Sequence, residues 1–233
     1  MNEWLHWARG PLFWTAFAFM VLGLARQLAL TLWELHRAWR RAGDRRLPRR
    51  SLVRNTIRWL VPFDRWRNRR LYSVTTLTFH AGVLLVPLFL AGHIDLWRRG
   101  IGASWPALPN PVATALTAAV ILAAVAVMLQ RAAALESRSL SRFQDYAIPL
   151  LIAVVFGSGL LVMHPQWNPV AADGALLLHA LAADGLLFLV PVSKLSHMVL
   201  LPVTQLVSEL AWHFPPDAGR RVGVALGKEH EPV

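Results

Sequence analysis

Long apolar runs separated by polar connections dominate this chain. A hydrocarbon core about 30 Å thick needs about 20 apolar residues in a helix that rises about 1.5 Å per residue. Runs of that kind recur five times, at residues 11–32, 71–95, 112–131, 146–163 and 174–201. In lipid, only an α-helix or a closed β-barrel satisfies all backbone hydrogen bonds, and a single apolar run of this length can do so as a helix. The pattern therefore predicts five transmembrane helices. We therefore expect an all-α bundle that forms a single membrane domain over residues 1–233.

Composition strengthens this interpretation and narrows the chemistry. Of the 233 residues, 55% are hydrophobic and only 16% are charged, which is unusual for a water-soluble domain. The chain has no cysteine. It therefore cannot build a thiolate-ligated iron–sulfur cluster, a cysteine-rich zinc site or a covalently attached c-type haem. Any bound metal must use histidine, aspartate or glutamate.

The basic residues predict the orientation of the helices. Thirteen of the 24 Lys and Arg residues lie between Arg37 and Arg70, within the predicted connection 33–70. The loops on that side of the membrane hold nineteen basic residues, and the loops on the other side hold three. Because basic loops remain in the cytoplasm, we expect the amino terminus outside and the tail 202–233 inside. Because the basic residues are concentrated in one loop, the +11 net charge indicates membrane topology and not a nucleic-acid-binding surface. We expect a multi-pass protein of the cytoplasmic (inner) membrane, with lipid as its partner.

The basic loop contains one amphipathic segment. Val53, Ile57 and Leu60 fall on one helical face, and Arg54 and Arg58 are displaced from it. Such a helix can lie on an anionic leaflet, remain a solvated loop, or offer a docking surface to an acidic cytoplasmic partner. The sequence leaves these alternatives open.

Four histidines lie inside the apolar runs. His80 and His93 are in the second run, and His179 and His197 are in the fifth. An imidazole in hydrocarbon is costly unless it has a partner, so such residues mark a helix contact, a proton relay or a metal ligand. Depth in the membrane pairs His93 with His179 near the outside and His80 with His197 near the cytoplasm. Paired neutral imidazoles from facing helices are the usual axial ligands of b-type haem, so we expect two haem b groups.

Helical geometry gives two further expectations for these histidines. His179 and His197 are eighteen residues apart, about five turns, which would place them on one face about 27 Å apart. His80 and His93 are thirteen residues apart and would point about 140° from one another on a regular helix. We therefore expect a distortion between them, caused by Pro87.

Small residues beside the histidines complete this picture. We expect Gly82 and Gly92, in the second run, to leave the space that a flat macrocycle needs. Small residues also occur at ordinary contacts between transmembrane helices, so this feature has two interpretations.

Two sequence motifs resemble a known family. FHAG and a later GH in the second run, together with LH and SKLSH in the fifth, are similar to signatures of the respiratory nitrate reductase gamma subunit. That subunit is a five-span dihaem cytochrome b, related to membrane cytochromes associated with heterodisulfide reductase and dissimilatory sulfite reductase. The resemblance implies that His93 and His179 ligate the outer haem, and His80 and His197 the inner one. It also implies that quinol is oxidised near the outer haem and that electrons pass to a cytoplasmic iron–sulfur subunit.

Other polar residues near the outer side are candidates for a quinone site. His164 follows the fourth run and either accepts a quinol proton or caps the helix end at the interface. Trp167 and Arg98 are expected to border the same pocket. Arg98 and Arg99 would either neutralise haem propionates or reach lipid phosphates.

Asp184 is one of few acidic residues inside an apolar run. A carboxylate at the membrane centre costs about 2.5–3.5 kcal/mol on an insertion scale, so we expect it to face the bundle interior. Proton handling and a structural hydrogen bond to Ser or Thr are both compatible with its position.

The sequence thus favours an electron-transfer subunit that exchanges electrons between the quinone pool and an iron–sulfur partner. Two alternatives remain. A proton-coupled transporter would use the four histidines as a relay. A haem-free membrane anchor would explain the basic loop but not the buried imidazoles.

Overall fold

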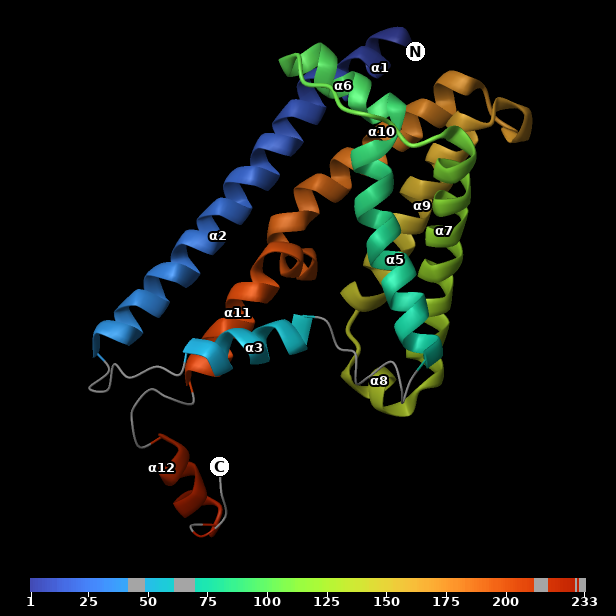
Figure 1. Ribbon diagram of the computed structural model, residues 1–233. Coiled ribbons are helices and arrows are strands. Elements are labelled where there is room, and N and C mark those ends of the chain that lie inside the picture. Colours follow the sequence, from blue (N-terminus) through green and yellow to red (C-terminus); the bar gives the residue numbers. More distant parts are fainter. Residues whose placement is uncertain (42–48, 61–69, 212–217, 229, 231–233) are drawn as a thin grey trace. The chain divides into compact units, whose positions relative to one another are not determined.

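The structure, a computed structural model, describes all residues except 42–48, 61–69, 212–217, 229 and 231–233 (Figure 1). Its described regular elements are helices. Within the described residues, five helical stretches are long and apolar enough to cross a membrane, as the sequence predicts: Asn2–Arg37, Arg70–Phe89, Asn110–Ala133, Gln144–Met163 and Ala172–Val192.

The described chain divides into two compact units. The first contains Met1–Met20 and Arg65–Leu189, and the second contains Val21–Asp64 and Val190–Val233. Helix α2 (Phe13–Arg41) begins in the first unit and continues in the second. The two units are described separately below.

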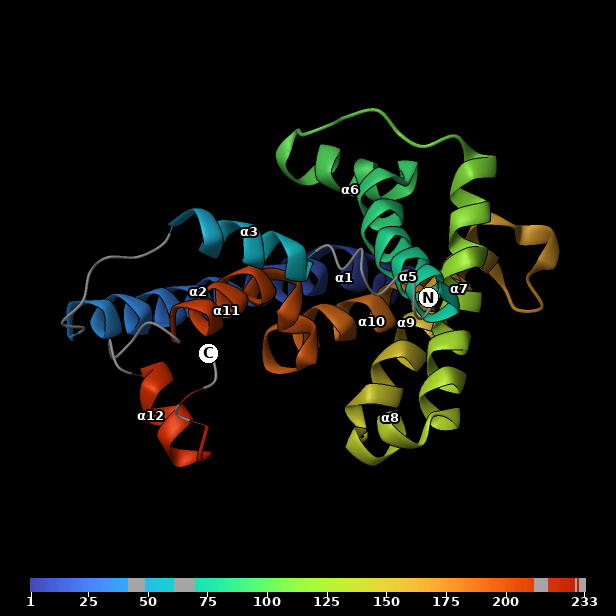
Figure 2. The same cartoon turned by 60° about the horizontal axis from the view of Figure 1, so that its bottom comes forward.

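Four long helices form the first unit. They are α5 (Arg70–Phe89), α7 (Asn110–Ala133), α9 (Gln144–Met163) and α10 (Ala172–Leu189). Helix α7 packs against α5 and α9, and α9 also packs against α10 (Figures 1 and 2). The short α1 (Asn2–Trp7) and the π-helical turn η1 (Ala8–Leu12) pack against α10. The helices α6 (Ala91–Ile101) and α8 (Leu135–Leu140) and the 3-10 turn η2 (Pro165–Trp167) lie in the connections.

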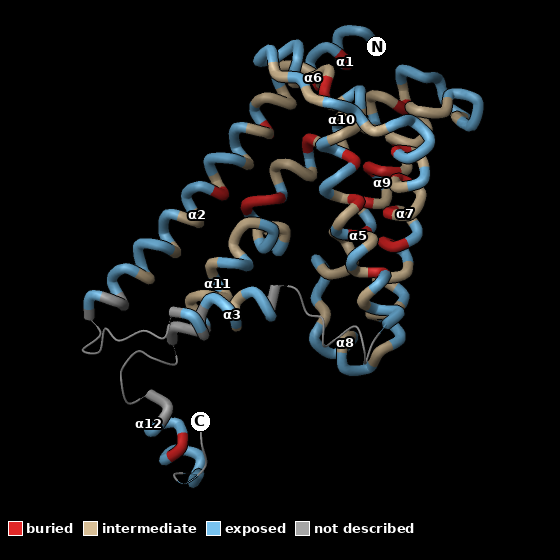
Figure 3. Tube along the Cα trace, in the orientation of Figure 1, coloured by how far each residue is buried: buried red, intermediate tan, exposed pale blue. Residues whose placement is uncertain are grey.

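The buried positions follow the helical period. On α5 and α7 they are spaced mainly three and four residues apart: Thr75, Phe79, Gly82 and Val86, and Ala113, Thr117, Val120, Ala123 and Ala124. Small side chains on α7 allow close approach of its neighbours. Figure 3 shows that buried and exposed positions alternate along these helices. The outward faces are apolar as well, since Leu122 and Leu129 are 70% and 64% exposed. A bundle with apolar side chains both inside and outside suits lipid surroundings.

Gly82 lies at the contact between α5 and α7. A Cβ atom added there would be 2.2 Å from Cγ2 of Val120, a side chain that is fully buried. The expectation that Gly82 leaves room for a macrocycle is therefore wrong, because Val120 fills that space. At Gly92 an added Cβ would meet nothing within 4 Å, so the space expected there is open.

We expect Gly82→Ala to lower the free energy of unfolding by about 1–3 kcal/mol, because the methyl group overpacks this contact. Thermal unfolding in detergent, followed by circular dichroism, measures the effect. Gly92→Ala is the matched control, since it also replaces a helical glycine but has open space. Equal melting temperatures for the two variants would contradict the contact.

The second apolar run is not one continuous helix. Helix α5 ends at Phe89, Leu90 is extended (φ −75°, ψ 130°), and α6 begins at Ala91. The predicted distortion between His80 and His93 is therefore confirmed, but it does not lie at Pro87, where the sequence places it. The predicted span 71–95 is too long, because the break is at Leu90, and Pro87 itself remains inside α5.

Downstream residues satisfy the carbonyl groups that the break releases. The indole N–H of Trp105 donates to the carbonyl of Leu88 (2.7 Å), and the Leu108 amide donates to the carbonyl of Phe89 (2.8 Å). The last carbonyls of a helix have no partner inside the helix, and within lipid an unpaired carbonyl is costly. The connection between α6 and α7 thus stabilises the end of α5.

The fifth apolar run is also interrupted. After α10 the chain forms two 3-10 turns, η3 (Val190–Val192) and η4 (Lys194–Ser196), separated by an extended Ser193. Helix α11 (His197–Ala211) follows. The prediction that His179 and His197 share one face of a continuous helix is therefore wrong, because the backbone leaves the α-helical path between them.

The second unit contains the latter part of α2, α3 (Arg49–Leu60), α11 and α12 (Ala218–Ala225). Helix α3 packs against α11. The side-chain amide of Gln27 donates to the carbonyl of Pro191, and a Cβ on Gly23 would lie 2.5 Å from the Pro191 ring. The absence of a side chain at Gly23 therefore lets α2 approach the interrupted part of the fifth run.

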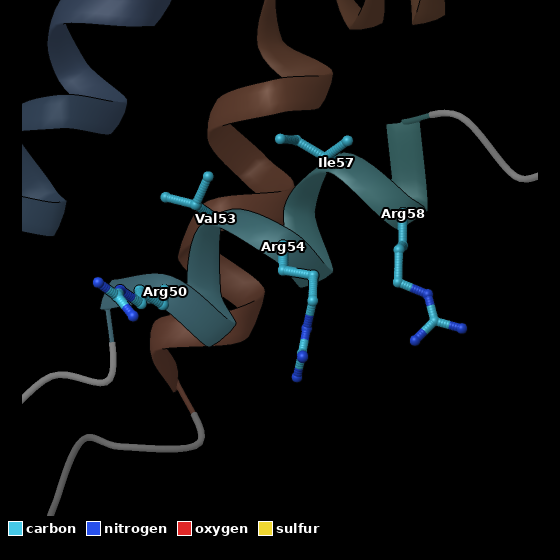
Figure 4. A pocket seen from close by; sticks show the side chains of 5 residues that line it. All are labelled: Arg50, Val53, Arg54, Ile57 and Arg58. Atoms are coloured by element: carbon cyan, nitrogen blue, oxygen red, sulfur yellow. The ribbon is translucent and has the colours of Figure 1, made fainter.

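Helix α3 confirms the helical segment predicted in the basic loop. Figure 4 shows Val53 and Ile57 on one side of the helix and Arg54 and Arg58 on another. These four residues and Arg50 line a shallow hollow of about 560 Å³. The side chain of Leu60, the third apolar residue of the predicted face, lies outside the described residues.

Candidate functional site

The structure brings together the two histidines that the sequence pairs near the outside. His93 lies in the first turn of α6, and His179 lies in the middle of α10. Their ring centroids are 6.0 Å apart, and the ring planes differ by only 4°. The break at Leu90 makes this possible, because His93 then lies on a new helix, α6, and its side chain no longer has the direction that a continued α5 would give it.

Backbone carbonyls orient both rings. The Nδ1–H of His93 donates to the carbonyl of Pro87 (3.1 Å), and the Nδ1–H of His179 donates to the carbonyl of Val155 (2.9 Å). A carbonyl can only accept, so the proton of each neutral ring is on Nδ1. The lone pair is therefore on Nε2, which is the usual arrangement of a metal-ligating histidine.

Helix α9 fits closely around the His179 ring. A Cβ added to Gly159 would be 3.0 Å from Cε1 and 3.2 Å from Nδ1 of this ring. The Ser158 hydroxyl lies 3.5 Å from Nδ1 and donates to carbonyls of its own helix. Gly159 therefore supplies the space in which the ring is held. Sequence analysis missed it, although the run Gly157-Ser158-Gly159 is a typical signal of close helix packing.

His93 follows the second membrane-spanning helix. Burial of its ring and the neighbouring His179 lower the pKa of His93 to about 4, whereas hydrogen bonds to the Pro87 and Val86 carbonyls act in the opposite direction. At neutral pH the imidazole is therefore uncharged, and an uncharged imidazole is the form that binds a metal.

The distance between the two rings matches the spacing of two imidazoles that share one metal ion. Imidazoles on opposite sides of a metal, each with a metal–nitrogen bond of about 2 Å, have ring centroids about 6 Å apart. Among the described residues, His, Asp and Glu do not form a metal-binding group of three or more. A porphyrin supplies four nitrogen ligands itself and needs only two from the protein.

His80 and His197 belong to different units, so each is described alone. His80 lies on the exposed face of α5, and its Nδ1 is 2.8 Å from the Thr76 carbonyl. His197 begins α11, and its Nδ1 is 2.6 Å from the Lys194 carbonyl. Each Nδ1 thus has the kind of backbone partner that orients ligating histidines.

His164 and Trp167, two of the three predicted quinone-site residues, are in contact. His164 directly follows α9, and its ring stacks on Trp167 with centroids 4.1 Å apart. Its Nε2 is 2.9 Å from the Thr114 hydroxyl, and its Nδ1 is 3.3 Å from the Gln166 amide nitrogen. Sequence analysis missed Thr114, because a residue fifty positions away gives no local signal.

Arg98, the third predicted residue, has a different partner. It forms an ion pair with Asp95 on α6 (2.6 Å), and Arg99 pairs with the same carboxylate (2.7 Å). Within the part of the chain that the structure describes, no hydrogen bond or ion pair joins Arg98 to His164.

Asp184 is buried, as expected for a carboxyl group inside a span. The residue is only 3% exposed, and its Oδ2 atom has no hydrogen-bond partner among the described residues. The predicted bond to Ser or Thr is not formed at this atom by the residues that the structure describes.

Comparisons with known proteins give one relative. No family model and no solved structure matches the chain. A protein of Nitratidesulfovibrio vulgaris (strain Hildenborough), described only as "Protein", is 35% identical over 165 residues, which cover 65% of this chain and 70% of the relative. The chain therefore belongs to the same family as this Nitratidesulfovibrio vulgaris protein.

Proposed function

We propose that the chain is a dihaem b-type cytochrome subunit that exchanges electrons between the membrane quinone pool and a cytoplasmic iron–sulfur oxidoreductase, as the nitrate reductase gamma subunit does. The observation that carries this proposal is the His93–His179 pair. Its parallel rings are 6.0 Å apart, and each donates Nδ1–H to a backbone carbonyl. Two neutral imidazoles in this arrangement suit one haem iron.

Each haem is assigned to a pair of histidines. His93 and His179 would hold the outer haem, and His80 and His197 the inner one. A bound haem would supply reversible one-electron transfer. The protein itself orients the rings. The carbonyls of Pro87 and Val155 accept hydrogen bonds from His93 and His179, and the close approach of Gly159 on α9 restricts the His179 ring.

The partner must supply chemistry that this chain lacks. With no cysteine, the chain cannot provide the thiolates of an iron–sulfur cluster. The nineteen basic residues on the proposed cytoplasmic side favour an acidic partner surface there. The amino terminus would then be outside, and α3 would lie on the partner's side of the inner membrane.

The purified protein tests this proposal directly. We expect the pyridine haemochrome assay to give about two non-covalent haem b groups per chain, and dithionite to produce the reduced b-type spectrum. Circular dichroism of the same sample verifies that it is helical. A folded but colourless preparation would exclude the cytochrome and leave the proton-coupled transporter or the haem-free anchor.

The quinone site is proposed next to His164 and Trp167. The aromatic stack could hold a flat quinol ring, and the imidazole could accept its proton. Nδ1 is the more available acceptor, because its contact with Gln166 (3.3 Å) is longer than that of Nε2 with Thr114 (2.9 Å).

We expect His164→Phe to slow quinol-driven haem reduction about a hundredfold, which is the lower end of the usual effect of losing a general base. Stopped-flow absorbance in liposomes measures the rate, and phenylalanine preserves the aromatic stack on Trp167. Gln166→Leu is the control, because it removes a neighbour of the ring but not the proton acceptor. An unchanged rate in His164→Phe would mean that His164 only caps α9.

A further inference from the structure

The strongest unassigned feature is a pocket between the start of the chain and α6. It has a volume of about 460 Å³ and combines polar and apolar side chains. Its lining residues are Asn2, Leu5, His6, Arg9, Gly10, Phe13, Trp14, Leu96, Arg99 and Gly100. All of them belong to the first unit. We propose that this pocket binds the phosphate headgroup of an anionic phospholipid at the outer face of the inner membrane.

The polar part of the pocket is positively charged. Arg9 and Arg99 line it, together with the side chains of His6 and Asn2. Asp95 is the nearby acid, and it pairs with both Arg98 and Arg99. Arg98 lies outside the pocket lining and neutralises Asp95, so the guanidinium groups of Arg9 and Arg99 leave the lining with a net positive charge that a phosphate can neutralise.

The apolar part of the pocket is a fixed aromatic wall. A Cβ atom on Gly100 would lie 2.0 Å from Cζ2 of Trp14, so the indole rests directly on the Gly100 backbone. Trp14 also makes edge contacts with Phe13 (5.2 Å) and Trp97 (5.9 Å). These contacts provide a rigid surface for the glycerol and upper acyl carbons of a lipid.

The position of the pocket favours a membrane lipid over a soluble anion. It lies where the first candidate span begins and next to α6, which follows the second span. Trp4 and Trp7 are exposed near it, and Trp97 contacts Trp105 (6.4 Å). Tryptophan gathers at the headgroup level of a bilayer, and arginine side chains reach phosphates from helix ends. The arginine side chains, the aromatic wall and the position at the ends of the spans therefore all match a phospholipid.

Native mass spectrometry of the detergent-purified protein tests this site. We expect one phosphatidylglycerol to bind more tightly than phosphatidylcholine. Arg9→Gln and Arg99→Gln should each weaken its binding about fivefold, as expected for loss of one basic residue at an anionic surface. Arg98→Gln is the matched control, because Arg98 pairs with the same Asp95 but does not line the pocket. Arg9→Lys, which keeps the charge, should retain most of the binding.

The other outcomes each contradict the proposal. Equal weakening in Arg98→Gln would show only a general effect of charge. Equal binding of phosphatidylcholine would exclude selection for an anionic lipid. Displacement of phosphatidylglycerol by millimolar inorganic phosphate would indicate a site for a soluble anion. Loss of haem from Arg9→Gln without loss of lipid would assign the pocket to haem carboxylates. The lipid measurement does not require haem, so it is independent of the proposed cytochrome function.

Discussion

Replacing His93 with alanine is expected to reduce the haem content from two to one per chain. The remaining His179 would be one axial ligand without its partner, because the structure places the two rings 6.0 Å apart and parallel. The inner haem that we propose for His80 and His197 would use other ligands, so it should be kept. The pyridine haemochrome assay gives the stoichiometry, and redox titration should then show one potential instead of two.

The second ligand and an exposed histidine provide the controls. His179→Ala should give the same loss as His93→Ala, whereas His36→Ala, on the exposed surface of α2, should keep both haems. Imidazole added to a His93→Gly variant should restore the missing spectrum, which a purely structural role would not allow. Two haems in a folded His93→Ala protein would exclude His93 as a ligand.

Gly159→Val is expected to remove the same haem although it changes no ligand. Even the first carbon of the new side chain would be 3.0 Å from the His179 ring, and valine adds two methyl groups. The ring must then leave the position in which it donates to the Val155 carbonyl. Haem stoichiometry and the absorption spectrum measure the loss, with circular dichroism as the measure of folding.

Gly157→Val is the matched control. Gly157 lies on the same helix, two residues earlier, but an added Cβ would meet nothing within 4 Å. The two variants therefore share the same change in side chain and helix propensity and differ only in contact with His179. If both keep two haems, Gly159 does not determine the position of the ring.

The sequence predicts the membrane architecture well because local composition determines it. The thickness of the hydrocarbon core fixes how many consecutive apolar residues a span needs, and the chain has five such runs. The lack of cysteine likewise excludes thiolate chemistry without any structural information. The candidate histidines were found for a similar reason, since a polar side chain in an apolar run is conspicuous.

The places where helices end were harder to predict from local pattern. The runs through Leu90 and through Val190–Ser196 are apolar enough to continue as helices, yet both are interrupted. Pro87 and Pro191 indicate that the helix is distorted nearby, but they do not indicate the residue at which it ends. At Leu90, the Trp105 and Leu108 N–H groups stabilise carbonyls that the ended helix releases, and these donors come from a later connection.

The sequence by itself thus determined the five apolar spans, the absence of thiolate ligands and the pairing of His93 with His179 as an expectation. Only the tertiary structure decided which small residues serve the site. The space beside Gly82 is filled by the Val120 side chain, whereas the space beside Gly159 is filled by the His179 ring. The two glycines look alike in the sequence. They differ because packing depends on which side chain of a neighbouring helix faces each position, and contacts between distant segments set that arrangement.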